Sequence, residues 1–129
     1  MLTSLYASII TIWLIIISFR VIGLRGNPVF KFFKFQDDNE NSLERAIRGH
    51  SNLIEYSPIF LILLYFSELA KFNDFYLHLI GSLFVLGRLM HGYCFAFLKY
   101  NMFLRVGGTV LAISCLSTLS LRLLINFFN

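Results

Sequence analysis

Polar side chains at helical spacing lie in a segment that runs directly into apolar residues. The positions that share this spacing are Glu44, Arg48, Asn52 and Glu55, followed by Tyr56, Pro58 and the apolar run 59–66. At 100° per residue, the first four lie within an arc of about 80° on one helix face. A charged side chain inside a bilayer costs at least about 2.5–3.5 kcal/mol and often marks a functional site. The segment therefore predicts a polar site on a membrane helix.

Other charged residues are predicted to reach the same depth. At 1.5 Å per residue, Glu55 lies about 16 Å along its helix from Glu44, and Arg88 lies about 15 Å from Leu98. In an up-down bundle both distances start from the same membrane surface. The chain also has Arg25 at the end of the first apolar segment, His91 three residues after Arg88, and Arg105 at the start of the last segment. We therefore expect these charges to gather in one half of the bilayer. Pro58 cannot donate to the Ile54 carbonyl, which predicts a helix irregularity beside Glu55.

Two interpretations of this cluster are open. One is an ion-pair network that only fixes helix packing, with Arg48 beside Glu55 and Glu44 beside Arg88. The other is a ligand site. The arginines are Arg25, Arg48, Arg88 and Arg105, and they outnumber the two glutamates. The surplus of positive charge favours an anionic ligand, with Glu44, Arg88 and Pro58 in structural or secondary roles.

The composition places the chain in a membrane. Of its 129 residues, 57% are hydrophobic and 14% are charged, and 15 are phenylalanine. This is more apolar surface than a soluble domain of this length can bury. We expect a single domain over 1–129, an all-α up-down bundle of four transmembrane helices over about 3–24, 44–70, 75–98 and 102–128. A signal peptide is the alternative for the first span, and the absence of a basic region before the apolar core disfavours it.

The distribution of lysine and arginine predicts the orientation. The loop over 25–43 and the turn at Lys99 carry most of the basic residues, whereas the opposite side has Lys71 and Arg122. The positive-inside rule then places both loops and the site at the cytoplasm, and both termini outside, in the periplasm. The net charge of +4 is read as this topology signal, and we expect no nucleic-acid partner. The Lys31–Phe35 segment is predicted to anchor the loop at the lipid head groups.

Other chemistries have little support in the sequence. Neither Cys94 nor Cys115 has the spacing of a metal ligand or disulfide framework, and both fit the interior of a bundle. No second histidine or cysteine accompanies His91 at metal spacing, so no metal is expected. There is no phosphate-binding glycine loop and no Ser-His-Asp arrangement.

These motifs resemble the MAPEG family, the membrane-associated proteins in eicosanoid and glutathione metabolism, and most of all its short bacterial members. The segments that carry the resemblance are Glu44-Arg45-x-x-Arg48-x-x-x-Asn52-x-x-Glu55-x-x-Pro58, Val21-Ile22-x-x-Arg25, Arg88-Leu89-x-His91 and Arg105. They cover nearly the whole chain.

The resemblance implies a homotrimer in the inner membrane, with glutathione bound at subunit interfaces and a lipophilic second substrate arriving through the lipid. Glutathione carries two carboxylates and one ammonium group, which several arginines and one carboxylate complement. By resemblance, the glutathione-binding residues are Arg25, Arg48, Asn52, Glu55, Tyr56 and His91. Arg105 would be the catalytic residue, stabilising the glutathione thiolate.

Two functions follow from this resemblance. The first is a glutathione-dependent transferase or peroxidase that acts on lipophilic electrophiles or hydroperoxides. The alternative is a non-enzymatic membrane protein of the same fold that binds an anionic metabolite or lipid head group. One departure bears on the choice, because family members that use glutathione generally have two tyrosines four residues apart in the third helix. The matching positions here are His91 and Phe95.

Overall fold

The computed structural model describes residues 1–37, 41–99 and 101–129. The helices of this structure are α1 (Leu2–Leu24), the 3₁₀ helix η1 (Lys31–Lys34), α2 (Ser42–Leu69), α3 (Asp74–Phe97) and α4 (Met102–Phe128). Each of the four α-helices is long and apolar enough to cross a membrane. The predicted all-α, four-helix membrane fold is confirmed.

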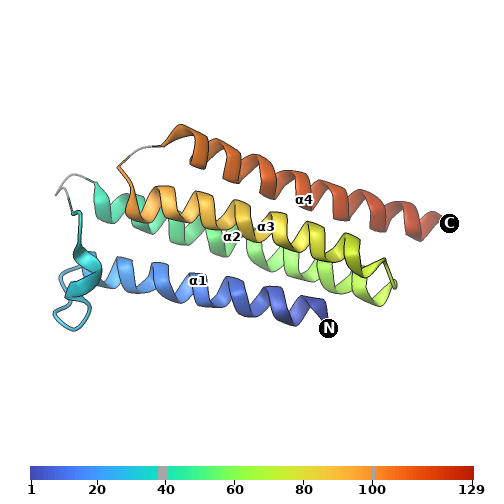
Figure 1. Ribbon diagram of the computed structural model, residues 1–129, viewed down its shortest axis with the longest axis horizontal. Coiled ribbons are helices and arrows are strands. Elements are labelled where there is room, and N and C mark those ends of the chain that lie inside the picture. Colours follow the sequence, from blue (N-terminus) through green and yellow to red (C-terminus); the bar gives the residue numbers. More distant parts are fainter. Residues whose placement is uncertain (38–40, 100) are drawn as a thin grey trace.

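The four helices run up and down in one bundle (Figure 1). α2 and α3 form its middle, α1 packs against both of them from one side, and α4 packs against both from the other. The loop with η1 and the link between α3 and α4 lie at one end of the bundle, and both chain termini lie at the other end (Figure 1). α2, α3 and α4 therefore meet along a common line that α1 does not reach.

Asparagine side chains start two of the helices. The side chain of Asn73 accepts a hydrogen bond from the backbone N–H of Tyr76 at the start of α3, and that of Asn101 accepts one from Leu104 at the start of α4. Both satisfy N–H groups that have no partner within the helix. α2 continues through Pro58, which cannot donate to the carbonyl of Ile54.

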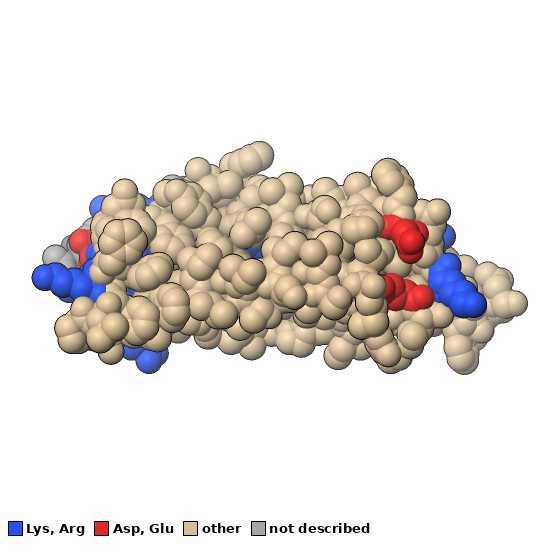
Figure 2. Space-filling model, turned by 60° about the horizontal axis from the view of Figure 1, so that its bottom comes forward, with Lys and Arg blue, Asp and Glu red and all other residues tan. Residues whose placement is uncertain are grey.

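The core consists of apolar side chains, and most charges lie at the ends of the bundle. Phe60 of α2 and Phe84 of α3 are fully buried, with parallel rings 3.7 Å apart. Large apolar side chains cover the outside of the helices, as they do in proteins whose exterior contacts lipid. On the face in Figure 2, almost all charged side chains gather at the two ends, and a long uncharged band lies between them.

Glycines bring α3 and α4 close together. A Cβ atom added at Gly108 would lie 2.6 Å from the carbonyl oxygen of Gly87 and 2.9 Å from the Cβ of His91. A Cβ at Gly87 would lie 2.9 Å from the carbonyl oxygen of Gly108. Small residues allow this close approach in membrane helices. The approach places the Gly108 carbonyl within reach of α3 side chains.

A carboxylate from α2 caps the first helix at the end with the termini. Glu68 accepts hydrogen bonds from the backbone N–H of Thr3 at 2.9 Å, from the Thr3 hydroxyl at 2.6 Å and from the backbone N–H of Leu2. These N–H groups have no partner within α1, and a negative charge there is favourable to the helix dipole. The Glu68 carboxylate therefore serves to hold the start of α1.

Candidate functional site

Arg88 lies where α2, α3 and α4 meet. Its side chain is only 2% exposed. One terminal nitrogen, Nη1, donates to Oδ1 of Asn52 on α2, and the other, Nη2, donates to the carbonyl oxygen of Gly108 on α4 at 2.9 Å. The guanidinium carbon lies 5.0 Å from the ring centroid of Tyr56 and 5.7 Å from that of Phe84. One buried cation therefore joins three helices by two hydrogen bonds and two cation–π contacts.

A second cation lies one layer toward the end of the bundle that carries the loops. The His91 ring stacks on the Phe95 ring with 4.6 Å between centroids, and the guanidinium of Arg105 lies 5.5 Å from the Phe95 centroid. His91 is buried and Arg105 is exposed. We call the six residues of the two layers the arginine cluster: Asn52, Tyr56, Arg88, His91, Phe95 and Arg105.

The arginine cluster carries positive charge without a carboxylate in contact. In the described part of the chain, neither Arg88 nor Arg105 has a carboxylate oxygen within 4.0 Å. Nη1 and Nη2 of Arg88 donate to Asn52 on α2 and to the Gly108 carbonyl on α4, so Arg88 holds the helices in register, while its buried Nε has no hydrogen-bond partner among the described residues. Arg105 makes a cation–π contact with Phe95, and no hydrogen bond from its side chain to the described residues is present, so its N–H groups are available to an anion. Among the residues described, no group of three or more His, Cys, Asp or Glu side chains could hold a metal ion.

The other polar residues of α2 lie on its outer face. Arg48 Nη2 and Glu44 Oε1 form an exposed ion pair 2.6 Å long, and Glu55 is also exposed. The sequence-based ion-pair interpretation predicted the wrong pairs. It placed Arg48 beside Glu55 and Glu44 beside Arg88, whereas Arg48 pairs with Glu44. Residues one turn apart pair along α2 instead. The same outer face continues with the exposed apolar residues Ile59, Ile62 and Phe66. We call this continuous stripe, from Glu44 to Phe66, the outer stripe of α2.

Arg25 lies away from the arginine cluster within one chain. It borders a small cleft of about 210 Å³ between α1 and α2, together with Ser18 and His50. The hydroxyl of Ser18 and Nε2 of His50 are 3.0 Å apart. The residues that line this cleft belong to α1 and α2, whereas α4 packs on α2 and α3 and makes no comparable contact with α1. The structure thus gathers Asn52, Tyr56, Arg88, His91 and Arg105, and leaves Arg25, Arg48 and Glu55 on other surfaces of the same chain.

Sequence reasoning missed Arg20. This side chain is 2% exposed and donates from Nε to the carbonyl oxygen of Ala96 at 2.8 Å. Nη1 donates to the carbonyls of Phe33 and Phe35, so Arg20 joins α1 to α3 and to the η1 segment. Arg20 lies four residues before Leu24, the last residue of α1, so the sequence does not distinguish it from a basic residue that flanks a membrane span. The acceptors are backbone carbonyls, which no sequence motif encodes.

The segment around η1, which the sequence predicts to be a membrane anchor, is held by Arg20 through the carbonyls of Phe33 and Phe35. Phe32 is 81% exposed, whereas Phe33 is half-buried and packs on Phe19. Lys34 contacts Asp37 at 3.8 Å. An exposed aromatic ring beside lysines is the arrangement expected of a segment at the head-group level.

Comparisons with known proteins agree with the four-helix architecture and the motifs. The profile of the MAPEG family matches residues 3–125. The inner membrane protein YecN of Escherichia coli, in strain K12 and in strain CFT073, is 35% identical over 95 residues, which cover 74% of this chain and 70% of YecN. No solved structure matches. The chain belongs to the MAPEG family.

Proposed function

We propose that this protein is a glutathione-dependent transferase or peroxidase of the inner membrane that acts on lipophilic electrophiles or hydroperoxides. The observation that carries the proposal is the arginine cluster, in which the cations Arg88 and Arg105 contact no carboxylate of the described chain. Glutathione has two carboxylates and becomes more negative when its thiol ionises. The family membership supports this particular anion.

Each residue has a distinct part in the proposed site. Arg88 positions Asn52 by a charge-assisted hydrogen bond, which fixes the amide for the peptide of glutathione. Arg48 and Glu55 are exposed on the neighbouring helix face, where they can bind a carboxylate and the ammonium group. Arg105 is the catalytic residue, because its exposed guanidinium can stabilise a thiolate close to the lipid.

A homotrimer would complete this site. The outer stripe of α2 is polar at one end and apolar beyond it, and it is exposed in a single chain. A neighbouring subunit packed along this stripe would bury the apolar part and bring its own Arg25 toward the glutathione. The two loops with most of the lysines and arginines would face the cytoplasm, where glutathione is available. The relative YecN is an inner membrane protein, which supports the same location here.

The proposed reaction uses the thiolate as the nucleophile. The thiol proton is lost to water, and the sulfur lone pair then forms a bond to an electrophilic carbon, whose leaving group departs with its electron pair. With a hydroperoxide, two glutathione molecules are oxidised to the disulfide while the hydroperoxide is reduced to an alcohol and water. The lipophilic substrate would reach Arg105 from the bilayer along the exposed apolar surface of α4.

Phe95 favours a second candidate function. Its ring stacks on His91 and supports Arg105, but it has no hydroxyl group to donate to a sulfur or a carboxylate. A protein of the same fold that binds an anionic metabolite or lipid head group, without turning it over, needs no such donor. Activity therefore separates the two functions more clearly than binding does.

The test is conjugation and reduction by the purified protein in detergent. Glutathione with 1-chloro-2,4-dinitrobenzene measures transferase activity, and glutathione with cumene hydroperoxide measures peroxidase activity. We expect Arg105→Ala to lower kcat by about 10²–10³-fold, the scale for losing one donor that stabilises a reacting anion. Lys31→Ala, which removes an exposed lysine of the loop, should leave kcat unchanged. Glutathione binding without either activity would favour the second function.

The oligomer is tested separately. Arg48→Ala and Glu55→Ala should leave the sedimentation coefficient of a trimer unchanged and weaken glutathione binding. If both variants dissociate the trimer instead, the outer stripe of α2 serves packing and does not serve the ligand.

A further inference from the structure

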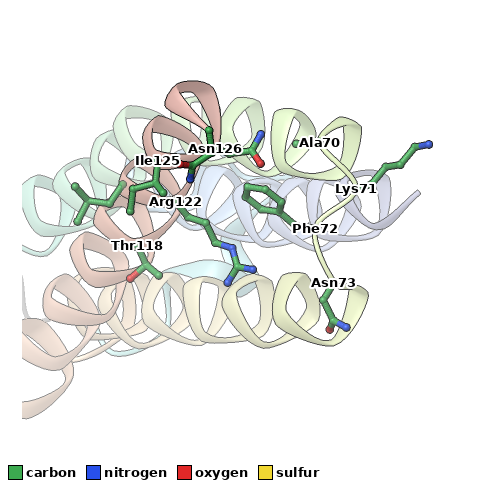
Figure 3. Close-up of a pocket in the computed structure, with 10 residues that line it drawn as sticks. Ala70, Lys71, Phe72, Asn73, Thr118, Arg122, Ile125 and Asn126 are labelled. Atoms are coloured by element: carbon green, nitrogen blue, oxygen red, sulfur yellow. The ribbon is translucent and has the colours of Figure 1, made fainter.

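A polar hollow lies at the end of the bundle opposite the arginine cluster. It has a volume of about 750 Å³ and lies between the turn that joins α2 to α3 and the last turns of α4. Its lining includes the cations Lys71 and Arg122, the amides Asn73 and Asn126, and the apolar residues Leu121 and Ile125 (Figure 3). None of these residues has a part in the proposed glutathione chemistry.

Two aromatic rings hold Arg122 in place. Its guanidinium carbon lies 4.4 Å from the ring centroid of Tyr76 and 5.0 Å from that of Phe72. The side chain leaves α4 and points toward the turn between α2 and α3, while Lys71 extends away from it at the rim (Figure 3). A cation over an aromatic ring is held by its charge, and a guanidinium has five N–H groups, so Arg122 keeps donors for a ligand. Arg122 is therefore a preorganised donor group in the wall of the hollow.

No acid of the described chain neutralises Arg122. None of its nitrogens lies within 4.0 Å of a carboxylate oxygen of a described residue. Glu68, at the same end of the bundle, is occupied by the first residues of α1. The side chain of Asn73 accepts from Tyr76 through its oxygen, so its NH₂ group can still donate. The hollow consequently offers donors and positive charge, which suit an anion.

The depth of the hollow matches the surface of the membrane. Lys71 lies in the turn between two transmembrane helices, and Arg122 lies six residues before the last residue of α4, about 9 Å along the helix. At this depth an arginine side chain reaches the phosphates of the lipid head groups. Leu121 and Ile125, 59% and 61% exposed, continue the lining toward the hydrocarbon. The hollow thus has a charged part at the head groups and an apolar part beside the acyl chains.

From this geometry we propose that the hollow binds the head group of an anionic phospholipid. The lipid phosphate would accept hydrogen bonds from Arg122 and from the amides of Asn73 and Asn126, Lys71 would add charge at the rim, and an acyl chain would lie on Leu121 and Ile125. An arginine and a lysine at the head-group level attract a lipid phosphate by their charge and hydrogen bonds. A free phosphate ion shares the charge but makes no use of the apolar wall, so the lipid is the occupant. The site is independent of the glutathione reaction.

The experiment measures lipid binding to the detergent-solubilised protein. The probes are phosphatidylglycerol, phosphatidylcholine and inorganic phosphate, and the readouts are lipid adducts in native mass spectrometry and the melting temperature. We expect phosphatidylglycerol to bind and to raise the melting temperature more than the other two probes. Arg122→Gln should weaken phosphatidylglycerol binding at least about tenfold, because a charged donor is lost. Lys31→Gln removes one charge at the other end and should leave binding unchanged.

A second variant, Asn126→Asp, tests the site in case Arg122→Gln does not fold. Asn126→Asp retains Arg122 and its two rings, and places a negative charge in the hollow, so it should also weaken phosphatidylglycerol binding. The proposal is overturned if Arg122→Gln and Asn126→Asp, both folded by circular dichroism, bind phosphatidylglycerol as the unaltered protein does. It is also overturned if Lys31→Gln loses as much binding as they do, or if inorganic phosphate raises the melting temperature as much as the lipid.

Discussion

Replacing Arg88 with methionine removes a buried cation and leaves two acceptors without a donor. Asn52 Oδ1 and the Gly108 carbonyl both accept from this guanidinium. Interhelical hydrogen bonds in a membrane protein average about 0.6 kcal/mol, and bonds to charged groups reach about 3 kcal/mol. Methionine has a similar length and fills much of the same space, so the loss comes mainly from the two bonds and the contact with Tyr56. We expect the free energy of unfolding to fall by about 2–4 kcal/mol.

Arg48→Met is the matched control, because it removes the same group from an exposed site. The Arg48–Glu44 pair is one turn apart on the helix surface, where such pairs contribute about 0.3–0.5 kcal/mol. Unfolding of both variants is measured by circular dichroism in mixed micelles with increasing sodium dodecyl sulfate. Equal losses in the two variants would refute the role assigned to Arg88, as would an Arg88→Met protein as stable as the unaltered chain.

A double-mutant cycle isolates the bond between Arg88 and Asn52. Asn52→Leu alone removes the acceptor and leaves a buried N–H of the guanidinium without its partner. In the Arg88→Met background, the Asn52 amide has already lost its donor, and Asn52→Leu replaces it with an apolar group. We therefore expect Asn52→Leu to cost about 1 kcal/mol less in that background. Additive losses would show that the two side chains do not interact.

Three further changes test other parts of the structure. Gly108→Ala would force the α3 and α4 backbones apart, since its Cβ would lie 2.6 Å from the Gly87 carbonyl oxygen; the same unfolding assay should show a loss of about 1–3 kcal/mol. Arg20→Gln removes donors to the carbonyls of Phe33 and Phe35, so limited trypsin digestion should cut the loop after Lys31 or Lys34 faster while the helices stay intact. Phe95→Tyr supplies a hydroxyl beside His91 and should raise the rate of glutathione conjugation; an unchanged rate would show that this position does not limit turnover.

The sequence was sufficient to predict the elements and the depth of the site. Hydropathy alone gives four apolar segments of spanning length, and the described residues form four such helices. Counting residues from one membrane surface predicted that Arg88 and the polar residues of α2 lie at the same depth in the membrane. The hydrogen bond from Arg88 to Asn52 agrees with this prediction. Both inferences use only helix rise and chain direction, which a bundle of straight helices preserves.

The lateral arrangement could not be predicted in the same way. A helical wheel shows which residues share a face, but it does not show which neighbour that face meets. Arg25 therefore seemed to join the other arginines, whereas it lies with His50 in a cleft between α1 and α2. Arg48 could pair along its own helix or across to another, and the pair with Glu44 is the one formed. Arg20 was missed because its acceptors are backbone carbonyls.

The central claim, that the arginine cluster binds glutathione as a thiolate, is tested most directly by ultraviolet difference spectroscopy. Glutathione is added to the purified protein in detergent near neutral pH, and the absorption band of the thiolate is recorded. We predict a saturable thiolate band that disappears in Arg105→Ala and persists in Lys31→Ala. No thiolate band in the unaltered protein, together with no measurable affinity for glutathione, would contradict the claim.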